Sequence, residues 1–427
     1  MTTFLIIACL LVLLVVGLPI GFAMCVSGAV GLYMIGGVST LLGILTTAPI
    51  SSVSSYELIS IPMFVLMAEF VIASRIADEL YDCMVVWVGR LPGGLAIATA
   101  LAGAGFGAIS GSSTVAAATL ASTSLPAMVR NGYERQLANG VVAISGTLAM
   151  LIPPSVALIL YSILTDLSVA KLLIAGVIPG LVVTLIIILT VLYLVWRDPA
   201  RAPAGRRYSL REKLVSMKST GPMLLLMFLI TGSIYLGLAT PTEASSLGAV
   251  GAFCIALLRG NLDVNSTRKA VVNACRTSAM IMMILIGAHV FGYALTLTQT
   301  TQKFVAAIAA LDANRYVIIS LILLLKLVLG FFLDQFAILI LTVPIMVPLI
   351  ITLGFDPIWF GVVLVVTAEV GMITPPVGMN AYVIARYTGR PVEEVFGGVL
   401  PHFIAHIFAI ILFTAFPMLI LWLPSTM

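Results

Sequence analysis

Two adjacent prolines in the middle of a long apolar segment constrain this chain more than any other feature. They lie in Gly371-Met-Ile-Thr-Pro-Pro-Val-Gly-Met-Asn380, inside an apolar run over 358–385 that is long enough to cross a bilayer. Proline lacks a backbone N–H and its ring clashes with the carbonyl one turn back, so the helix must break there. Within lipid, such a break is stable only where protein or a polar cavity satisfies the unpaired carbonyls. The stretch therefore predicts a binding site, whose carbonyls, with the Thr374 hydroxyl and the Asn380 amide, suit a small hard cation.

The same break occurs 222 positions earlier, where Met150-Leu-Ile-Pro-Pro154 corresponds to Met372-Ile-Thr-Pro-Pro376. At this offset no gap is needed over residues 112–179, and all four prolines in that window fall on prolines. We interpret this as an internal duplication, which is common in transporters.

The composition predicts an integral membrane protein with many spans. Of the 427 residues, 61% are hydrophobic and 9% are charged, whereas soluble proteins carry about 25% charged residues. The net charge of +4 is concentrated in a few loops, so it bears on orientation and not on nucleic acid. The five cysteines have no paired spacing, so we expect neither disulfides nor a metal site from them.

Apolar length and helix breakers divide the chain into two repeats of one plan. Each repeat has five crossings, one re-entrant hairpin whose arms are too short to cross, and one broken helix. A segment over 38–55 is expected outside or at the interface, and 75–90 is expected as an amphipathic interfacial helix. The predicted boundaries are 1–197 for the first repeat (hairpin 93–128, broken helix 137–164), 198–218 for a basic linker, and 219–427 for the second repeat (hairpin 316–350, broken helix 358–385).

An odd number of crossings makes the two repeats inverted relative to each other. The linker region is the only long hydrophilic stretch, with seven basic residues against two acidic ones over 197–218, so the positive-inside rule predicts that it is cytoplasmic and that both termini are periplasmic. Lys171, Lys303 and Arg315 are isolated exceptions on the predicted outer side.

The turns of the two hairpins carry polar side chains at membrane depth. The first turn, Gly107-Ala-Ile-Ser-Gly-Ser-Ser-Thr114, supplies Ser110, Ser112 and Ser113, which either form a polar site or bond back to carbonyls and permit close packing. Asp334 lies in the second turn and either serves a binding site or forms a structural ion pair with Lys326.

Four further polar residues stand out. Glu369, within the second broken helix, is either a proton-relay group or a buried structural partner. Glu243 is expected to cap the start of a helix. His402 and His406 are spaced as a metal pair would be, but no third ligand is evident nearby.

Four stretches together resemble a known family: Gly107–Thr114, Met150–Ser155, Gly237-Leu-Ala-Thr-Pro-Thr-Glu-Ala244 and Gly371–Asn380. Over essentially its whole length the chain resembles the DctM-like large membrane subunit of a tripartite ATP-independent periplasmic (TRAP) transporter. The resemblance implies an all-α polytopic protein of the bacterial inner membrane that works as an elevator-type transporter. It also implies two partners, a small four-helix membrane subunit and a soluble periplasmic binding protein, with Na⁺ driving the uptake of a small organic acid.

Carried over by motif, the resemblance implies two sodium sites with the substrate between them. The first sodium site lies between the first hairpin tip and the first break, and the second lies between the second tip and the second break. The implied sodium ligands are Ser110, Ser145, Met150, Ile152 and Pro153 for the first site, and Gly330, Thr367, Gly371, Met372 and Thr374 for the second. The implied substrate residues are Ser110, Ser112, Ser113, Ser155, Asp334 and Asn380.

Two other functions remain as alternatives at this point. A stand-alone symporter of the dicarboxylate or citrate type would need no binding protein. An enzyme is not expected, because no nucleophile–base pair and no metal cluster occurs in the sequence, and the absence of a phosphate-binding loop argues against direct use of ATP. From the sequence, the organic acid stays unidentified. Protons remain an alternative coupling ion.

Overall fold

The structure of the chain, a computed structural model, describes residues 2–74, 76–309 and 313–427. Every regular element in these ranges is a helix. Seven helices are long and apolar enough to cross a membrane, and a bent pair within α11 would make eight. This agrees with the all-α, multi-span fold class predicted from composition.

Among the residues that the structure describes, the first half of the chain has ten α-helices. They are α1 (Thr2–Val15), α2 (Ile20–Val53), α3 (Ser60–Ala73), α4 (Ile76–Val88), α5 (Gly94–Ser110), α6 (Ser113–Arg130), α7 (Arg135–Thr147), α8 (Val156–Thr165), α9 (Val169–Ala175) and α10 (Val177–Arg197). The segment over 38–55, which the sequence placed outside the spans, belongs for most of its length to α2. Gly36 and Gly37 have non-helical backbone angles and kink this helix, and Gly37 has a φ of 65°, which glycine adopts without strain.

The second half contains ten more. They are α11 (Leu210–Tyr235), α12 (Pro241–Leu258), α13 (Val264–Leu297), α14 (Thr300–Ala309), α15 (Arg315–Gly330), α16 (Gln335–Thr352), α17 (Pro357–Gly371), α18 (Met379–Thr388), α19 (Val392–Ala415) and α20 (Met418–Leu421). The last part of the predicted linker is therefore helical, and α11 bends by 59° beyond Lys218.

The helix boundaries follow the 222-residue offset of the sequence. Helix α6 covers 113–130 and α16 covers 335–352, so both of their ends are 222 residues apart. Helices α7 and α17 start at 135 and 357, with the same separation. Each is followed by a non-helical stretch that contains a cis Pro-Pro bond.

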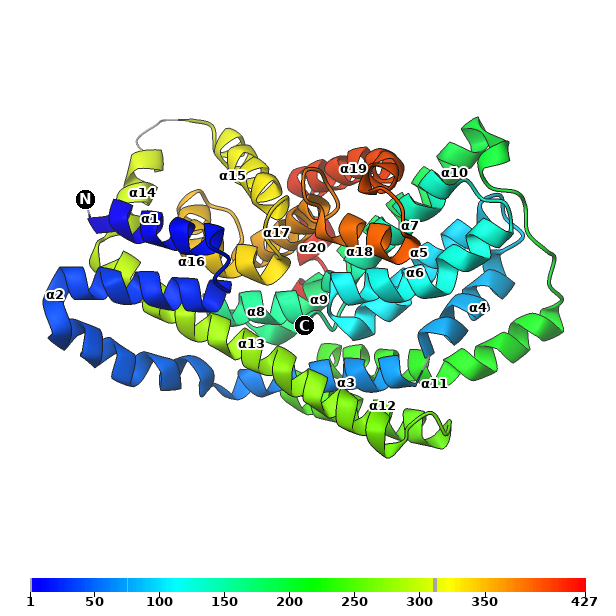
Figure 1. Ribbon diagram of the computed structural model, residues 1–427, viewed down its shortest axis with the longest axis horizontal. Helices are drawn as coiled ribbons and strands as arrows, with labels where there is room; N and C mark the ends of the chain where they lie inside the picture. The colour runs from blue at the N-terminus through cyan, green and yellow to red at the C-terminus, as the bar shows by residue number, and fades with distance from the viewer. Residues whose placement is uncertain (1, 75, 310–312) are drawn as a thin grey trace.

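Figure 1 shows the helices in two layers. We call α2, α3 and α11–α13 the scaffold layer, and the hairpins α5–α6 and α15–α16 with the broken helices α7–α8 and α17–α18 the hairpin layer. Within the scaffold layer, α2 packs along α13 through glycines. A methyl group added to Gly28 would lie 2.8 Å from the backbone of Phe291, so only a small residue permits this approach.

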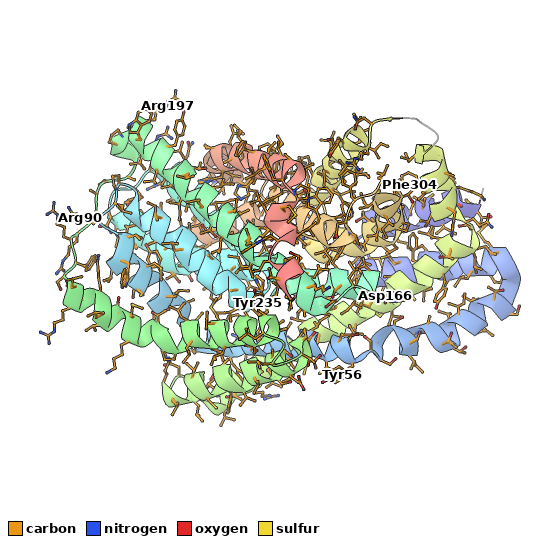
Figure 2. All side chains as sticks on the ribbon, turned by 180° about the vertical axis from the view of Figure 1, so that it is seen from behind. Tyr56, Arg90, Asp166, Arg197, Tyr235 and Phe304 are labelled. Atoms are coloured by element: carbon orange, nitrogen blue, oxygen red, sulfur yellow. The ribbon has the colours of Figure 1, made fainter. Side chains whose placement is uncertain are left out.

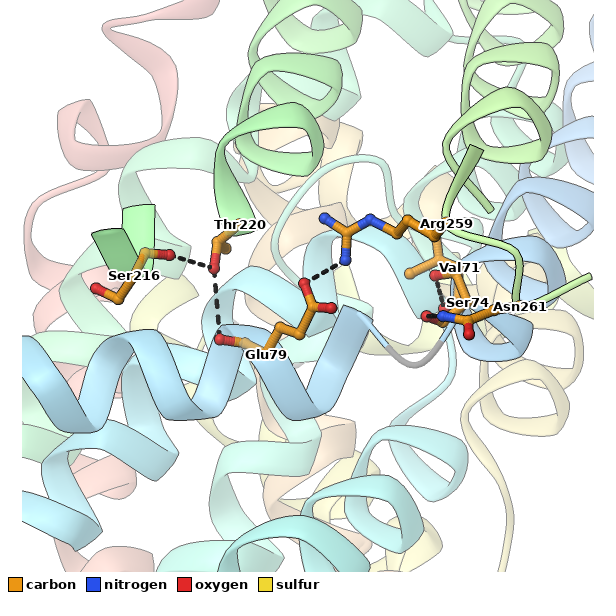
Figure 3. A network of polar contacts seen from close by, with 7 residues as sticks. All are labelled: Val71, Ser74, Glu79, Ser216, Thr220, Arg259 and Asn261. Atoms are coloured by element: carbon orange, nitrogen blue, oxygen red, sulfur yellow. Dashed lines mark hydrogen bonds and ion pairs between the residues drawn. The ribbon is translucent and has the colours of Figure 1, made fainter. Parts of the chain in front are cut away.

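Polar contacts hold α4, which links the two layers, against the scaffold layer (Figure 3). Glu79 of α4 forms an ion pair with Arg259 at the end of α12. The Thr220 hydroxyl on α11 donates to the Glu79 carbonyl at 3.4 Å, and the Asn261 amide donates to the Ser74 carbonyl at 2.8 Å. The two contacts of Glu79 fix the first turn of α4, and the contact of Asn261 fixes the end of α3.

The start of α12 confirms the capping role expected of Glu243. The Thr240 side chain accepts from the Glu243 backbone N–H at 3.2 Å, and the Glu243 carboxylate accepts from the Thr240 N–H at 2.8 Å.

Basic residues mark one end of the molecule. Figure 2 shows Arg90 and Arg197 at one end and Phe304 at the opposite end. Arg197 directly precedes the predicted basic linker, so we predict that this end is the cytoplasmic one.

Candidate functional site

A cavity of about 870 Å³ lies where the hairpin layer meets the scaffold layer. Both hairpin tips, both breaks and the facing parts of α2, α3 and α13 line it. Six of the fifteen residues predicted to bind substrate or sodium are among its lining: Ser110, Ser112, Ser113, Met150, Asp334 and Met372. The other nine do not line it.

The first tip presents hydroxyl groups to this cavity. Helix α5 ends at Ser110, and the C-cap residue Gly111, with a φ of 57°, reverses the chain before Ser112 and α6. The hydroxyls of Ser112 and Thr114 lie 3.3 Å apart. Ser110 is 7% exposed, and its hydroxyl has no hydrogen-bond partner among the described residues.

The first tip also contacts the second break directly. The Ser113 hydroxyl donates to the Met372 sulfur at 3.9 Å, across 259 positions of sequence. The contact places the tip in the first half of the chain against the broken helix of the second half, so the two halves build one site together.

The second tip carries Asp334 as the N-cap of α16. Its carboxylate accepts from the Ala337 N–H at 3.0 Å. The alternative ion pair with Lys326 is not formed, because the Lys326 ammonium is fully buried and has no hydrogen-bond partner within the part of the chain that the structure describes. A capping carboxylate keeps free lone pairs that point away from the helix, so Asp334 can still accept from a ligand.

At the first break, two serines differ in their bonding. Ser155 caps α8, because its hydroxyl accepts from the Leu158 N–H at 3.2 Å and also donates to the Met150 carbonyl. Ser145 is fully buried against Gly103 of α5, and no hydrogen-bond partner of its hydroxyl is found in the described ranges. Ile152 and Pro153 belong to the same break and do not line the cavity.

At the second break, the hydroxyls of Thr367 and Thr374 donate to carbonyls of their own helix. Their partners are Val363, at 2.8 Å, and Val370, at 2.6 Å. A hydroxyl that donates its hydrogen keeps lone pairs, so these oxygens remain available to a cation. The sodium-binding role of both residues stays a prediction.

Asn380 follows the second break and is fully buried. Its backbone N–H donates to the Met372 carbonyl at 3.1 Å. Neither atom of its side-chain amide has a partner among the residues described. A buried amide with both functions unpaired is suited to a ligand or an ordered water.

Gly330 and Gly371 bring the second hairpin onto its broken helix. A methyl group on Gly371 would lie 2.5 Å from the Gly330 Cα and 2.8 Å from the Leu327 carbonyl oxygen. These two predicted sodium residues are therefore neighbours through their backbones.

Comparison with known proteins identifies the family. A profile of the family described as "Tripartite ATP-independent periplasmic transporter, DctM component" matches residues 7–419. The chain belongs to this family. It is thus a TRAP large permease, a multi-pass protein of the inner membrane, and this family is not an enzyme class. TRAP large permeases work with a small membrane subunit and a periplasmic binding protein.

Relatives of this TRAP large permease cover most of its length. The C4-dicarboxylate TRAP transporter large permease protein DctM of Pseudomonas aeruginosa is 37% identical over 371 residues, which is 87% of this chain and 86% of that protein. The sialic acid TRAP transporter large permease protein SiaM of Vibrio cholerae is 29% identical over 415 residues, 97% of this chain and 96% of that protein.

Two solved transporters share the fold of this TRAP large permease. The YdaH transporter of Alcanivorax borkumensis matches 94% of this chain and 98% of its own with a TM-score of 0.64 at 14% identity. MtrF of Neisseria gonorrhoeae matches 93% of both chains with a TM-score of 0.62 at 14% identity.

Sequence reasoning missed one charged residue of the cavity in this TRAP large permease. Glu69 of α3 lines the wall opposite the tips, and its carboxylate accepts from the Asn273 side chain of α13 at 3.1 Å. The rule that identified Asp334, an acid at membrane depth, applies equally to Glu69. Its position inside the apolar run over 58–74 was the available signal.

The other polar residues that stood out in the sequence lie away from this cavity. Glu369 is 3% exposed within α17, and one of its oxygens has no partner among the described residues. His402 and His406 are buried in α19, where the His406 ring nitrogen lies 2.9 Å from the His402 carbonyl. None of the three lines the cavity at the tips.

Proposed function

We propose that this TRAP large permease takes up a small organic acid through the cavity between its hairpin tips, driven by Na⁺. The observation that carries the proposal is the shared cavity itself. Polar tips from both repeats meet there at the breaks of both broken helices. A transport site of this kind needs polar groups at membrane depth that are held by backbone breaks.

The tips can hold a carboxylate without a basic side chain. The hydroxyls of Ser110, Ser112 and Ser113 are potential donors, and the N-terminal N–H groups of α6 point toward the same turn. Hydrogen bonds to an ionised acceptor are roughly twice as strong as neutral ones. C4-dicarboxylate and sialic acid, which the names of the relatives give as their substrates, are both carboxylates, which supports the choice of an organic acid.

Sodium coupling is supported by the chemistry of the breaks. Carbonyl and hydroxyl oxygens bind a cation without taking up a proton, whereas proton coupling would need a carboxylate such as Glu369. Ser145 and Thr367 place hydroxyls at equivalent points of the two repeats. We therefore assign one Na⁺ to each repeat.

The proposal also includes the inverted arrangement of the two repeats and an elevator movement of the hairpin layer. The cavity has the hairpin layer on one side and the scaffold layer on the other, and the contacts of Glu79 anchor α4 to the scaffold. In this mechanism the hairpin layer moves with the substrate along a fixed scaffold, and the small subunit supports that scaffold.

Reconstitution in liposomes tests the proposal. The permease is incorporated with and without its small subunit, the binding protein is supplied outside, and uptake of labelled acids is followed under an inward Na⁺ gradient. Uptake is expected only with all three components and Na⁺. Robust uptake by the large subunit alone would favour the stand-alone symporter. Uptake driven equally well by a proton gradient in sodium-free buffer would contradict the proposed sodium sites.

A further inference from the structure

A second, largely apolar groove lies on the hairpin layer, away from the tips. It has a volume of about 490 Å³, with α15 on one side, α19 on the other and Thr367 of α17 at its floor. Figure 1 shows α15 and α19 on the same face of the molecule, with α17 between them. Its aliphatic walls are formed by Leu323, Leu324, Leu327, Ile407, Ile410 and Ile411.

This groove is open to the surroundings of the protein. Leu324 and Ile411 are 55% and 59% exposed at its rims. Helix α19 is long and apolar enough to cross a membrane and α17 is a shorter apolar helix, so we expect this groove to face lipid. An open apolar groove in contact with acyl chains does not stay empty.

The hydroxyl groups in the groove do not make it polar. Ser320, Thr367 and Thr414 each donate to a carbonyl of their own helix, at 2.7, 2.8 and 2.8 Å. Their hydrogens are therefore already used within the helices. The groove offers its occupant mainly carbon atoms.

A fixed cation lies at one end of the groove. The Arg315 guanidinium lies 5.1 Å from the ring centre of Tyr316, which lines the groove, and 5.4 Å from that of Phe355. It also donates to the Tyr316 hydroxyl at 3.3 Å. Among the described residues, no carboxylate forms an ion pair with Arg315. Aromatic contacts thus position the guanidinium and leave donors free for an anion.

The dimensions match one leaflet of a bilayer. From Tyr316 to Leu327 the groove follows α15 for eleven residues, about 16 Å at ~1.5 Å per residue. This is about half of the ~30 Å hydrocarbon core. Arg315, the first residue of α15, then lies at headgroup level.

We propose that this groove binds one anionic phospholipid, with an acyl chain along α15 and α19 and the headgroup phosphate on Arg315. A guanidinium pairs with phosphate through two parallel N–H···O bonds, which gives the site its preference for phosphate. The site also gives a reason for a basic residue on the side where the positive-inside rule expects none. Because the lipid contacts α15, α17 and α19 at once, it stabilises their packing.

Lipid retention by the purified full-length permease tests the proposal. The protein is delipidated in detergent and titrated with phosphatidylglycerol, and the bound copies are counted by native mass spectrometry beside the melting temperature. Arg315→Gln removes the cation, and Ile411→Trp fills the groove. The matched controls are Arg130→Gln, an exposed arginine elsewhere, and Ile404→Trp, an exposed position of α19 outside the groove.

The wild type and both controls are expected to retain one tightly bound phosphatidylglycerol that raises the melting temperature. Each groove variant should bind it at least about tenfold more weakly, since one charge-assisted contact or the acyl-chain volume is lost. Equal retention in all proteins would overturn the proposal. So would a loss confined to Arg315→Gln, which indicates a headgroup contact without a groove, or equal retention of phosphatidylcholine. Displacement of the lipid by the small subunit would assign the groove to that subunit instead.

Discussion

Ser110 and Asn380 are buried polar side chains whose hydrogen-bonding side-chain atoms have no partner in the described part of the chain. Leaving such a group unpaired in a protein interior costs about 1–3 kcal/mol. A substrate, an ion or ordered water that supplies the missing partner removes this cost. At the scale of single residues, a ligand that reaches Ser110 on the cavity wall therefore gains by supplying this partner.

Ser112 should be required for transport and dispensable for folding. It lines the cavity at the first tip, so in Ser112→Leu the bulky side chain should reduce uptake at least about tenfold by blocking the carboxylate position. Ser122→Leu makes the same change at an exposed position of α6, the helix that Ser112 precedes, and should leave uptake unchanged. Retained transport in Ser112→Leu would assign this serine to packing.

Asp334→Asn separates binding from helix capping. Asparagine caps helices about as well as aspartate, so the melting temperature should stay within a few degrees while uptake falls. The control is Asp356→Asn, because Asp356 caps α17 through the Ile358 N–H at 2.7 Å and does not line the cavity. A collapse of the melting temperature together with uptake would show that Asp334 acts through the fold.

At the scale of helices, close backbone contacts decide how the broken helices pack. In Gly371→Ala the new methyl group meets the Gly330 backbone at 2.5 Å, which only a shift of α15 against α17 can relieve. We expect a loss of about 1–3 kcal/mol in stability, measured by thermal unfolding, and reduced uptake. Gly292→Ala in α13 meets no atom within 4 Å and should be neutral or slightly stabilising. If the two changes had equal effects, the close contact between Gly371 and Gly330 would not be the cause of the lost stability.

The sequence predicted which helices and turns form the site better than it predicted which of their residues pack against one another. The Pro-Pro pairs and the polar turns mark positions where a membrane helix cannot continue, so both breaks and both turns were found from local chemistry. The offset of 222 residues pairs Ser145 with Thr367, but it does not show that Ser145 packs against Gly103 while Thr367 lies at the floor of the groove on the outer face. Glu69 was missed for the same reason, because only tertiary packing places α3 opposite the tips.

At the scale of the whole molecule, two ions should act together with one substrate. Uptake should rise with a Hill coefficient above one in Na⁺ and persist when the pH gradient is collapsed. Thr374→Val removes a hydroxyl oxygen at the second break and should weaken Na⁺ activation more than substrate affinity. Thr388→Val, which removes a hydroxyl bonded in the same way within α18, should change neither. Activation by Na⁺ that is the same in both variants would argue against the second site.

The cavity wall is divided between two layers, with Ser110 on one side and Glu69 on the other. A substrate small enough to touch only the tips can travel with them. A larger acid that also carries a cationic group for Glu69 would bind both walls at once. It would then prevent the hairpin layer from moving relative to the scaffold layer. Such a compound would act as a blocker that is not itself carried, and lengthening the spacer of a carried acid is a direct route to an inhibitor of this permease.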